Sequence, residues 1–444
     1  MRNSLLAKIL LVVVCSCYFF PFELNALPGL NSKMATAAVG LVLFCWEHFR
    51  HRIYTLRADL VPVLVLGLVF SLSSLMSVAF NGTNDMVFVT YFVSMAVWLG
   101  GAYCVIWLMR RIYGKASLQH VFLYLGIMCA GHCILALMID NSDFLKNFVE
   151  TVFVTATEYF EHNVRLYSIG VGFDTAGIRF STVLLGLGYL ERNTGATARQ
   201  KIFYVTLFLI IGVIGNMISR STVIGLAFGL VYMFFPSLEW LRSKITGRNI
   251  AIFSAVCCCL VLAAIGGVRL YESSPGVREL MDYGFEGFIN FFETGTFSTH
   301  SSDLILDNIF LILPDNPKTW IIGDGYFADP FDPSKFYMGT DVGFTRLVFY
   351  GGLIGLGCFT LYFAYCTYAL SMRTRYLTMF FIMMFLIQMV VWLKIPTDIF
   401  CTYALMLLCD GHDWQAATGT AETTDMIETT GTTDIKETTE RTVI

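Results

Sequence analysis

Long apolar runs separated by short polar segments make up most of this chain. A membrane-spanning helix needs about 20 apolar residues, with a range of about 17 to 25. On that measure the pattern predicts about twelve spans, of which the second, sixth and last are short. They lie at residues 5–22, 33–46, 59–79, 86–109, 119–139, 176–191, 201–217, 221–236, 250–268, 342–370, 376–393 and 395–409. The predicted fold class is therefore an all-α integral membrane protein.

Composition supports this class. The 444 residues are 56% hydrophobic and only 14% charged, and the mean hydropathy is +0.66. That is more apolar surface than a soluble core can bury. The formal net charge of −4 gives no reason to expect nucleic acid as a partner. Most of the 13 cysteines lie in apolar runs and residues 269–341 contain none, which favours small buried hydrophobes over a disulfide framework or a zinc site.

The distribution of Lys and Arg predicts the orientation. Positive charge concentrates in cytoplasmic loops, and here the clusters fall in alternate loops, which predicts that both termini are cytoplasmic. The clusters are Arg2 with Lys8, Arg50 with Arg52 and Arg57, Arg110 with Arg111 and Lys115, Arg192 with Arg199 and Lys201, Arg242 with Lys244 and Arg248, and Arg373 with Arg375. The first run, 5–22, has the length of a signal peptide, but no small-x-small cleavage site follows it closely, so we interpret it as an uncleaved helix.

The same alternation places two larger loops on the outer side, at about 140–177 and about 269–341, the latter between the ninth and tenth spans. Within the first loop, residues 144–153 have apolar positions at helical spacing, which predicts an amphipathic helix that lies on the bilayer surface or packs on the protein. Residues 1–409 form the predicted membrane domain. The Thr-rich tail, 410–444, has almost nothing to bury and is predicted to be disordered in the cytoplasm.

Residues 283–357 are the only long segment that mixes Asp, His, Ser, Gly, Pro and aromatic residues. A loop of this length is usually functional or disordered, and its aromatic content argues against disorder. Ser301 or Ser302, followed by Asp303, is predicted to cap a short helix at 304–311, and Thr299 and Ser301 add hydroxyls suited to an anion or a sugar. His300 has no second His or Cys nearby, so a general base or a sugar contact is favoured over metal ligation.

Four arginines depart from the positive-inside pattern. Arg220 lies in a tight hairpin, Arg179 opens the sixth span, and Arg346 lies about one turn into the tenth. Together with Arg269 at the end of the ninth span, they are expected at one depth near the outer interface. Guanidinium groups are costly there unless paired, and their planar fork suits a lipid-linked phosphate or pyrophosphate. The alternatives are that some of these arginines snorkel to headgroups or pair with Asp174, Glu272 or Asp341.

Asp341 precedes the tenth span, about one helical turn from Arg346. Burial and a cationic neighbour would shift its pKa in opposite directions. As a general base it could take a proton from an attacking hydroxyl. Two other roles remain open for this carboxylate: capping the helix N-terminus and pairing with Arg346. Residues 323–325 (Gly-Asp-Gly) are predicted to form a tight turn.

These features together resemble a known family. A Ser-Arg-Ser hairpin at 219–221, Gly-Asp-Gly-Tyr at 323–326, and Gly-Thr-Asp-Val-Gly-Phe-x-Arg at 339–346 before a Tyr-Gly-Gly helix resemble the Wzy-type O-antigen polymerases of Gram-negative bacteria. The match covers about 291–355, with further support around Arg179 and Arg220. Many members carry an arginine in the middle of the long loop, where this chain has Thr-His-Ser at 299–301, and the role of His300 stays open.

The resemblance implies an inner-membrane glycosyltransferase whose active site faces the periplasm. It would transfer growing O-polysaccharide from undecaprenyl pyrophosphate to the next lipid-linked repeat unit, with a chain-length regulator and a flippase as partners. No outer-side Asp-x-Asp motif is present, so we expect neither a metal nor a cofactor. The implied site residues are Arg179, Arg220 and Arg346 for pyrophosphate, with Arg346 also catalytic, Asp341 and His300 for catalysis, and Thr299, Ser301, Asp324 and Tyr326 for glycan.

Two other functions are compatible with much of the pattern. An O-antigen ligase shares the membrane plan and the lipid-linked donor, but that family shows a histidine near the start of the helix after the long loop, where this chain has Asp341. A flippase of lipid-linked oligosaccharide would favour internal repeats and polar residues at the bilayer midplane. No convincing repeat is present here, and the polar residues are predicted at the outer interface.

Overall fold

The computed structural model describes most of the membrane domain. The described residues are 4–51, 58–155, 165–192, 195–235, 254, 275–296, 298–299, 303 and 312–410. The predictions made for the ninth span (250–268), Arg269, His300, Ser301, the helix at 304–311 and the tail beyond Asp410 lie outside these residues.

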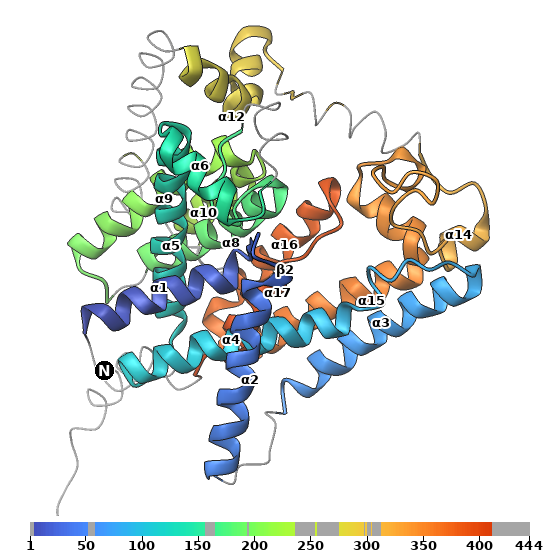
Figure 1. Cartoon of the computed structure of the whole chain (residues 1–444), viewed down its shortest axis with the longest axis horizontal. Helices are drawn as coiled ribbons and strands as arrows, with labels where there is room; N and C mark the ends of the chain where they lie inside the picture. The colour runs from blue at the N-terminus through green and yellow to red at the C-terminus, as the bar shows by residue number, and fades with distance from the viewer. Residues whose placement is uncertain are drawn as a thin grey trace, which may run out of the picture. The chain divides into compact units, whose positions relative to one another are not determined.

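The chain is built mainly from helices (Figure 1). They are α1 (Leu5–Phe19), α2 (Ser32–His51), α3 (Val61–Asn81), α4 (Tyr91–Tyr113), α5 (Leu118–Asp140), α6 (Asp143–Val152), α8 (Phe173–Arg192), α9 (Ala198–Ile218), α10 (Thr222–Phe234), α12 (Pro275–Thr294), α14 (Pro317–Ile321), α15 (Gly343–Arg373), α16 (Thr378–Lys394) and α17 (Phe400–Leu408), with short 3-10 turns η2 (Tyr337–Gly339) and η3 (Arg375–Leu377). Hydroxyl side chains mark several starts, as where Ser117 accepts from the backbone N–H of His120.

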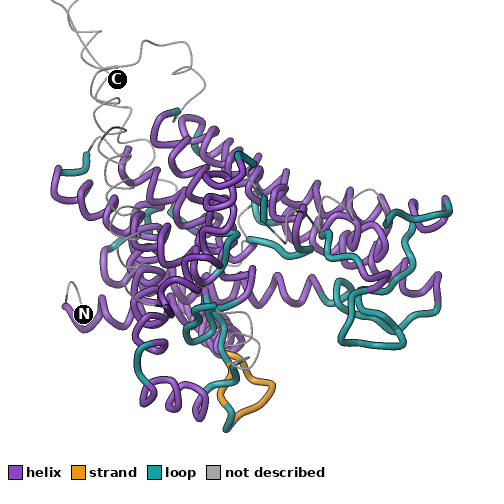
Figure 2. The backbone as a smooth tube through the Cα atoms, turned by 90° about the horizontal axis from the view of Figure 1, so that it is seen from above, coloured by secondary structure: helices purple, strands orange, loops and turns teal. Residues whose placement is uncertain are grey.

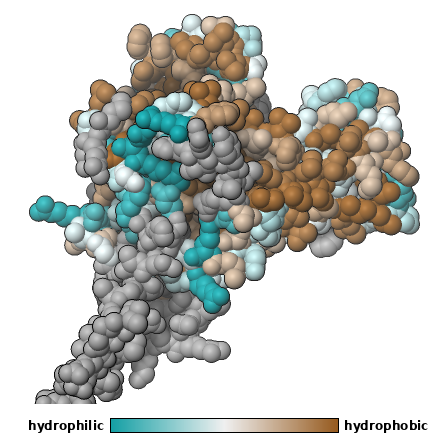
Figure 3. Space-filling view, turned by 90° about the horizontal axis from the view of Figure 1, so that it is seen from below, coloured by the Kyte–Doolittle hydropathy of each residue, from teal (hydrophilic) through white to brown (hydrophobic). Residues whose placement is uncertain are grey.

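Six helical segments in the described part of the chain are long and apolar enough to cross a membrane: α3, α4, α5, α9, α15, and η3 continued by α16. The membrane class predicted from the sequence is therefore supported, while the count of twelve spans stays a prediction. Apolar side chains such as Val65, Leu68 and Leu72 on α3 are exposed, and Figure 3 shows a broad apolar surface. Such a surface suits contact with lipid.

The structure differs from the sequence-based prediction in three segments. α17 has nine residues and spans about 14 Å at 1.5 Å per residue, which is too short for the span expected at 395–409. α4 begins at Tyr91 and not at 86, because the apolar residues before it form a loop in which Phe88 packs beside Phe70 and Tyr350. A two-stranded hairpin, β1 (Glu23–Leu24) and β2 (Leu27–Asn31), links α1 to α2 and was not predicted (Figure 2).

The predicted amphipathic helix after α5 is present as α6. Its Val149 is 2% exposed and packs beside Ile139 and Tyr167, whereas Phe144 and Phe148 are 78% and 51% exposed. One face of α6 thus packs on the protein and the other carries exposed aromatic side chains. Asn25 of the hairpin donates to the backbone oxygens of Glu150, Thr151 and Phe153 at the end of α6.

Close helix packing around α8 positions the residues discussed below. A Cβ added to Gly225 of α10 would lie 2.1 Å from Cα of Ser181, so the two helices touch backbone to backbone, as small residues allow in membrane proteins. Ser181 strengthens the contact, because its hydroxyl donates to the backbone oxygen of Ser221 at 2.9 Å and accepts from the N–H of Gly225 at 3.0 Å. The start of α8 is thereby fixed against the α9–α10 turn.

Candidate functional site

The turn that joins α16 to α17, residues 395–399, packs against the start of α15, where Gly343 contacts Ile395. Two α16 side chains hold it: Gln388 Nε2 and Trp392 Nε1 donate to the backbone oxygen of Thr397 at 2.9 and 2.8 Å, and Gln388 Oε1 accepts from the N–H of Ile399 at 2.9 Å. These bonds satisfy backbone groups that a break between two apolar helices would otherwise leave unpaired. The turn is therefore a fixed element, and the charged residues at its two ends have defined places.

Lys394, just before the turn, contacts the start of α8. Its Nζ lies 2.9 Å from Oδ1 of Asp174, which also accepts from the hydroxyls of Ser219 and Ser221 at 3.2 and 3.0 Å. Burial raises the pKa of Asp174, but the Lys394 charge and hydrogen bond, the Arg165 charge and the Ser221 hydroxyl outweigh it, so the pKa lies below its ordinary value of 3.8. Asp174 thus joins α16 to the α9–α10 turn.

Asp174→Asn is expected to lower the free energy of unfolding by about 1 to 3 kcal/mol at neutral pH, because Lys394 loses its counter-ion. The folded-state pKa of Asp174 is depressed, so its stabilisation is present above the unfolded pKa and is lost as the pH falls through the folded one. Thermal unfolding of the purified protein at pH 7 and at about pH 3 tests this prediction. The difference in stability between wild type and Asp174→Asn should be smaller at the lower pH. An equal difference at both pH values would contradict the prediction.

Arg220, in the predicted hairpin, contacts α12. Its guanidinium forms an ion pair with Glu286 and lies 4.6 Å from the ring centre of Tyr283. The guanidinium of Arg165 lies 4.7 Å from the same ring centre. α12 is held further by Asn216, which donates to the backbone oxygen of Gly284. The charge of Arg220 is therefore compensated by a carboxylate that sequence reasoning did not single out.

Arg179 lies in a different environment, beside Lys33 of α2. The two cations lie over the ring of Trp98 on α4, with Lys33 Nζ 4.4 Å and Arg179 Cζ 5.4 Å from its centre. The ring of Phe20 is 5.9 Å from Arg179. The carboxylate of Asp398, in the 395–399 turn, acts electrostatically on both cations. Among the described residues, neither cation has an ion-pair partner within 4.0 Å.

Arg346 is buried under the segment that precedes α15. Its side chain is 4% exposed, and its guanidinium lies 3.6 Å from the ring centre of Phe336 and 4.0 Å from that of Phe327. Within the described chain, its Nε and Nη2 have no hydrogen-bond partner. Gly343, one turn earlier, packs on the backbone of Ile395, since a Cβ there would lie 2.5 Å from the Ile395 carbonyl carbon. Arg346 is thus near the same turn, but it is not clustered with Arg220.

Asp341 is exposed, so the burial expected for this carboxylate is wrong. The chain is extended at Thr340, which is fully buried, and neighbouring side chains in an extended segment point to opposite sides. Val342, and not Asp341, is the N-cap residue of α15. Among the described residues no ion pair within 4.0 Å joins Asp341 to Arg346, although the charge of Asp341 acts on that arginine.

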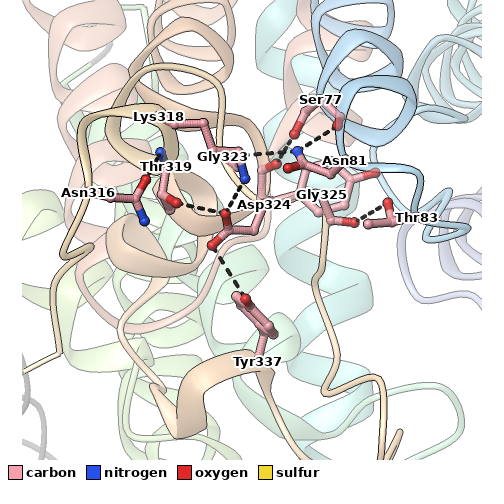
Figure 4. Close-up of polar contacts among 11 residues, drawn as sticks. Ser77, Asn81, Thr83, Asn316, Lys318, Thr319, Gly323, Asp324, Gly325 and Tyr337 are labelled. Atoms are coloured by element: carbon pink, nitrogen blue, oxygen red, sulfur yellow. Dashed lines mark hydrogen bonds and ion pairs between the residues drawn. The ribbon is translucent and has the colours of Figure 1, made fainter.

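The predicted tight turn at 323–325 is present and supports α15 (Figure 4). α15 is broken at Gly352, where φ is 64° and ψ is −168°. The N–H groups of Asp324 and Gly325 donate to the backbone oxygens of Phe349 and Tyr350 at 2.6 and 3.1 Å. The hydroxyl of Ser77 on α3 donates to the same Tyr350 oxygen at 2.6 Å. The turn therefore pairs backbone groups that the break would leave without partners.

The side chains predicted to bind glycan have local partners where the structure describes them. Asp324 accepts from Lys318 Nζ and the Thr319 hydroxyl, both at 2.7 Å, and from the Tyr337 hydroxyl at 3.4 Å (Figure 4). Tyr326 stacks on Tyr337 with ring centres 5.3 Å apart. For Thr299 the contact is made by the backbone: its carbonyl oxygen accepts from the N–H of Asp303 at 3.0 Å. Asp324 and Tyr326 thus belong to one aromatic and polar cluster around Tyr337.

Sequence reasoning missed Lys33, Trp98 and Asp398. Lys33 opens a predicted span and Asp398 lies inside one, and a charge within an apolar run is itself a functional signal in membrane proteins. That signal could have found both residues, but it could not have shown that Lys33 of α2 and Arg179 of α8 converge on Trp98. Among the described residues, no group of three or more His, Cys, Asp or Glu side chains could hold a metal ion.

Comparison with known proteins gives no further guide. No family model matches the chain, and no curated protein and no solved structure is significantly similar to it.

Proposed function

We propose that this protein is a membrane-embedded glycosyltransferase that polymerises O-antigen repeat units from undecaprenyl-pyrophosphate-linked donors. The observation that carries the proposal is three cations: Lys33 and Arg179, which share the ring of Trp98, and Arg346, which is buried against Phe327 and Phe336. In the described chain none of them has an ion-pair partner within 4.0 Å. By contrast, Arg220 and Lys394 both have a carboxylate partner.

Unpaired cations in such surroundings favour an anionic ligand. Removing a charge from water costs several kcal/mol per ion unless a counter-charge offsets it, and Arg346 is 4% exposed. A pyrophosphate supplies several negative oxygens that a guanidinium can bind in pairs. A lipid-linked pyrophosphate fits a protein with long apolar helices, because its hydrocarbon tail stays in the bilayer while its headgroup reaches the cations.

The chemistry expected of the reaction matches this charge pattern. Cleavage of a glycosyl-phosphate bond builds negative charge on the leaving pyrophosphate, and preorganised cationic donors stabilise such charge best where water is excluded. The attacking hydroxyl of the next repeat unit forms the new bond to the sugar, the bond to phosphate breaks, and the hydroxyl proton goes to a base. The proposal places this site on the periplasmic face of the inner membrane, in agreement with the orientation expected from the positive-inside pattern of the sequence. A chain-length regulator and a flippase are the proposed partners.

Deletion of the gene in its own host tests the proposal, with the lipopolysaccharide ladder read on a silver-stained gel. The expected result is core that carries a single repeat unit, with the ladder restored by the wild-type chain. Core without any repeat, together with lipid-linked polymer, would instead identify a ligase. Accumulation of single-repeat carrier in the cytoplasmic leaflet would identify a flippase, and either result would overturn the proposal.

A further inference from the structure

Two phenylalanine rings enclose the guanidinium of Arg346. Its Cζ lies 3.6 Å from the ring centre of Phe336 and 4.0 Å from that of Phe327. These are distances of direct contact, about 3.5 to 4.0 Å, so no water molecule fits between the guanidinium and either ring. Nε and Nη2 are buried and have no hydrogen-bond partner in the described part of the chain. Buried donors are normally satisfied, so these two N–H groups have unmet capacity for an anionic oxygen.

Phe327 is the fixed one of the two rings. Its backbone N–H donates to Oδ2 of Asp85, in the loop before α4, at 2.7 Å. Its ring packs edge-to-face beside that of Phe88, with centres 5.5 Å apart, and Phe88 is itself buried. Phe327 is therefore held to the rest of the protein by both its backbone and its side chain.

Phe336 is the exposed one. Its side chain is 42% exposed, and residues 329–335 (Asp-Pro-Phe-Asp-Pro-Ser-Lys) are polar enough to show that this side of the loop faces water. Its backbone contacts lie within the same loop: a bridge with Ala328, and a hydrogen bond in which its carbonyl oxygen accepts from the N–H of Gly339 at 2.9 Å. Phe336 thus separates Arg346 from water, and it can move with its loop while Phe327 stays in place.

We propose that Phe336 makes this site transfer the sugar to a glycan and not to water. Its ring lifts to admit the donor and closes again, so that water is kept from the pyrophosphate bound at Arg346. The inference rests on the proposed function, and Phe336 acts in it as a specificity-determining residue.

Transfer and hydrolysis differ only in the attacking oxygen. In transfer, the acceptor hydroxyl oxygen forms a bond to the anomeric carbon, the bond from that carbon to the phosphate oxygen breaks, and the pyrophosphate leaves with the electron pair while the hydroxyl proton goes to a base. In hydrolysis a water oxygen forms the new bond, loses its proton in the same way, and releases free glycan. Closing a site over its substrate prevents such side reactions, and an apolar ring offers water no hydrogen bond.

The first readout is the product that the purified full-length protein forms in liposomes from the lipid-linked repeat unit extracted from the deletion strain. Phe336→Ala should raise the ratio of free glycan to elongated lipid-linked glycan at least about tenfold, because water reaches the donor. Phe336→Leu keeps an apolar cover and should stay near wild type. The matched control is Phe331→Ala, which removes a ring that is 96% exposed in the same loop and should leave the ratio unchanged.

The second readout does not depend on the reaction. Phenylglyoxal modifies accessible guanidinium groups, and peptide mass spectrometry reports the modification of Arg346. In Phe336→Ala this arginine should react about tenfold faster than in wild type or in Phe331→Ala, because its cover is gone. Arg373, paired with Asp59 at 2.8 Å, is the internal reference, since unfolding would expose both arginines.

A merely structural role for Phe336 would lower both products together and leave their ratio unchanged. That result would overturn the inference, and so would equal reactivity of Arg346 in Phe336→Ala and wild type. Either result, obtained with a wild-type protein that elongates the repeat unit, leaves the proposed function intact. Absence of elongation by the wild-type protein would instead reject the proposed function, and the inference with it.

Discussion

Arg346→Met is expected to lower polymer formation at least about 100-fold, the effect of removing one preorganised donor to a developing charge. Methionine keeps the length and apolar character of the side chain, so packing between Phe327 and Phe336 should survive. Arg346→Lys keeps the charge but not the planar fork, so it should recover only part of the activity. The measurement is the lipopolysaccharide ladder in the complemented deletion strain, at matched protein levels.

Lys335→Met is the control for Arg346→Met. Lys335 lies nearby in the sequence and is a cation whose side chain is 73% exposed and paired with Asp332 at 3.1 Å. Its removal should leave the ladder unchanged. A full ladder from Arg346→Met would show that this buried guanidinium does not serve the reaction, and would leave its unpartnered nitrogens without a functional explanation.

Gly352→Ala is expected to cause the largest loss of stability. The backbone there, with φ 64° and ψ −168°, lies in a region that is essentially restricted to glycine, and occupying it costs another residue about 1 to 3 kcal/mol. A Cβ would in addition lie 2.2 Å from the backbone oxygen of Ile321. Because this contact is with backbone, relief requires the end of α14 at Ile321 to move. A total above about 4 kcal/mol is expected, which is exceptional for one substitution.

Gly351→Ala provides a matched control in the adjacent residue. A Cβ there meets nothing within 4 Å and the φ angle is not positive, so the change should stay within about 1 kcal/mol of wild type. Thermal unfolding and yield of the purified protein measure both variants. Equal stability of the two would show that the break in α15 is not constrained by its contact with the end of α14.

The sequence predicted the helical membrane class and the position of most apolar helices, because the length of an apolar run reflects the thickness of the bilayer. It predicted a short last span at 395–409, but not that α17 has only nine residues, whose apolar side chains are buried against protein. Hydropathy cannot separate burial in protein from burial in lipid. The loop before α4 shows the same effect, because Phe88 is apolar yet lies outside the helix, packed beside Tyr350.

The sequence predicted which types of residue form the candidate site, but not how these residues are arranged. Arg179, Arg220 and Arg346 were identified as positive charges that depart from the positive-inside pattern. Which of them has a counter-ion depends on contacts across the fold. Glu286, which pairs with Arg220, is 66 residues away in the chain. The exposure of Asp341 was not predicted either. Asp341 is exposed because the chain is extended beside buried Thr340, and no local sequence signal encodes that orientation.

The most direct test of the polymerase proposal is elongation by the purified full-length protein in liposomes, with the lipid-linked repeat unit extracted from the deletion strain as the only glycan. The proposal predicts undecaprenyl-pyrophosphate-linked products of two, three and more repeat units, formed without nucleotide sugar, lipid A-core or any second protein. Products that appear only when lipid A-core is added, or single-repeat carrier that crosses the bilayer without elongation, would contradict it.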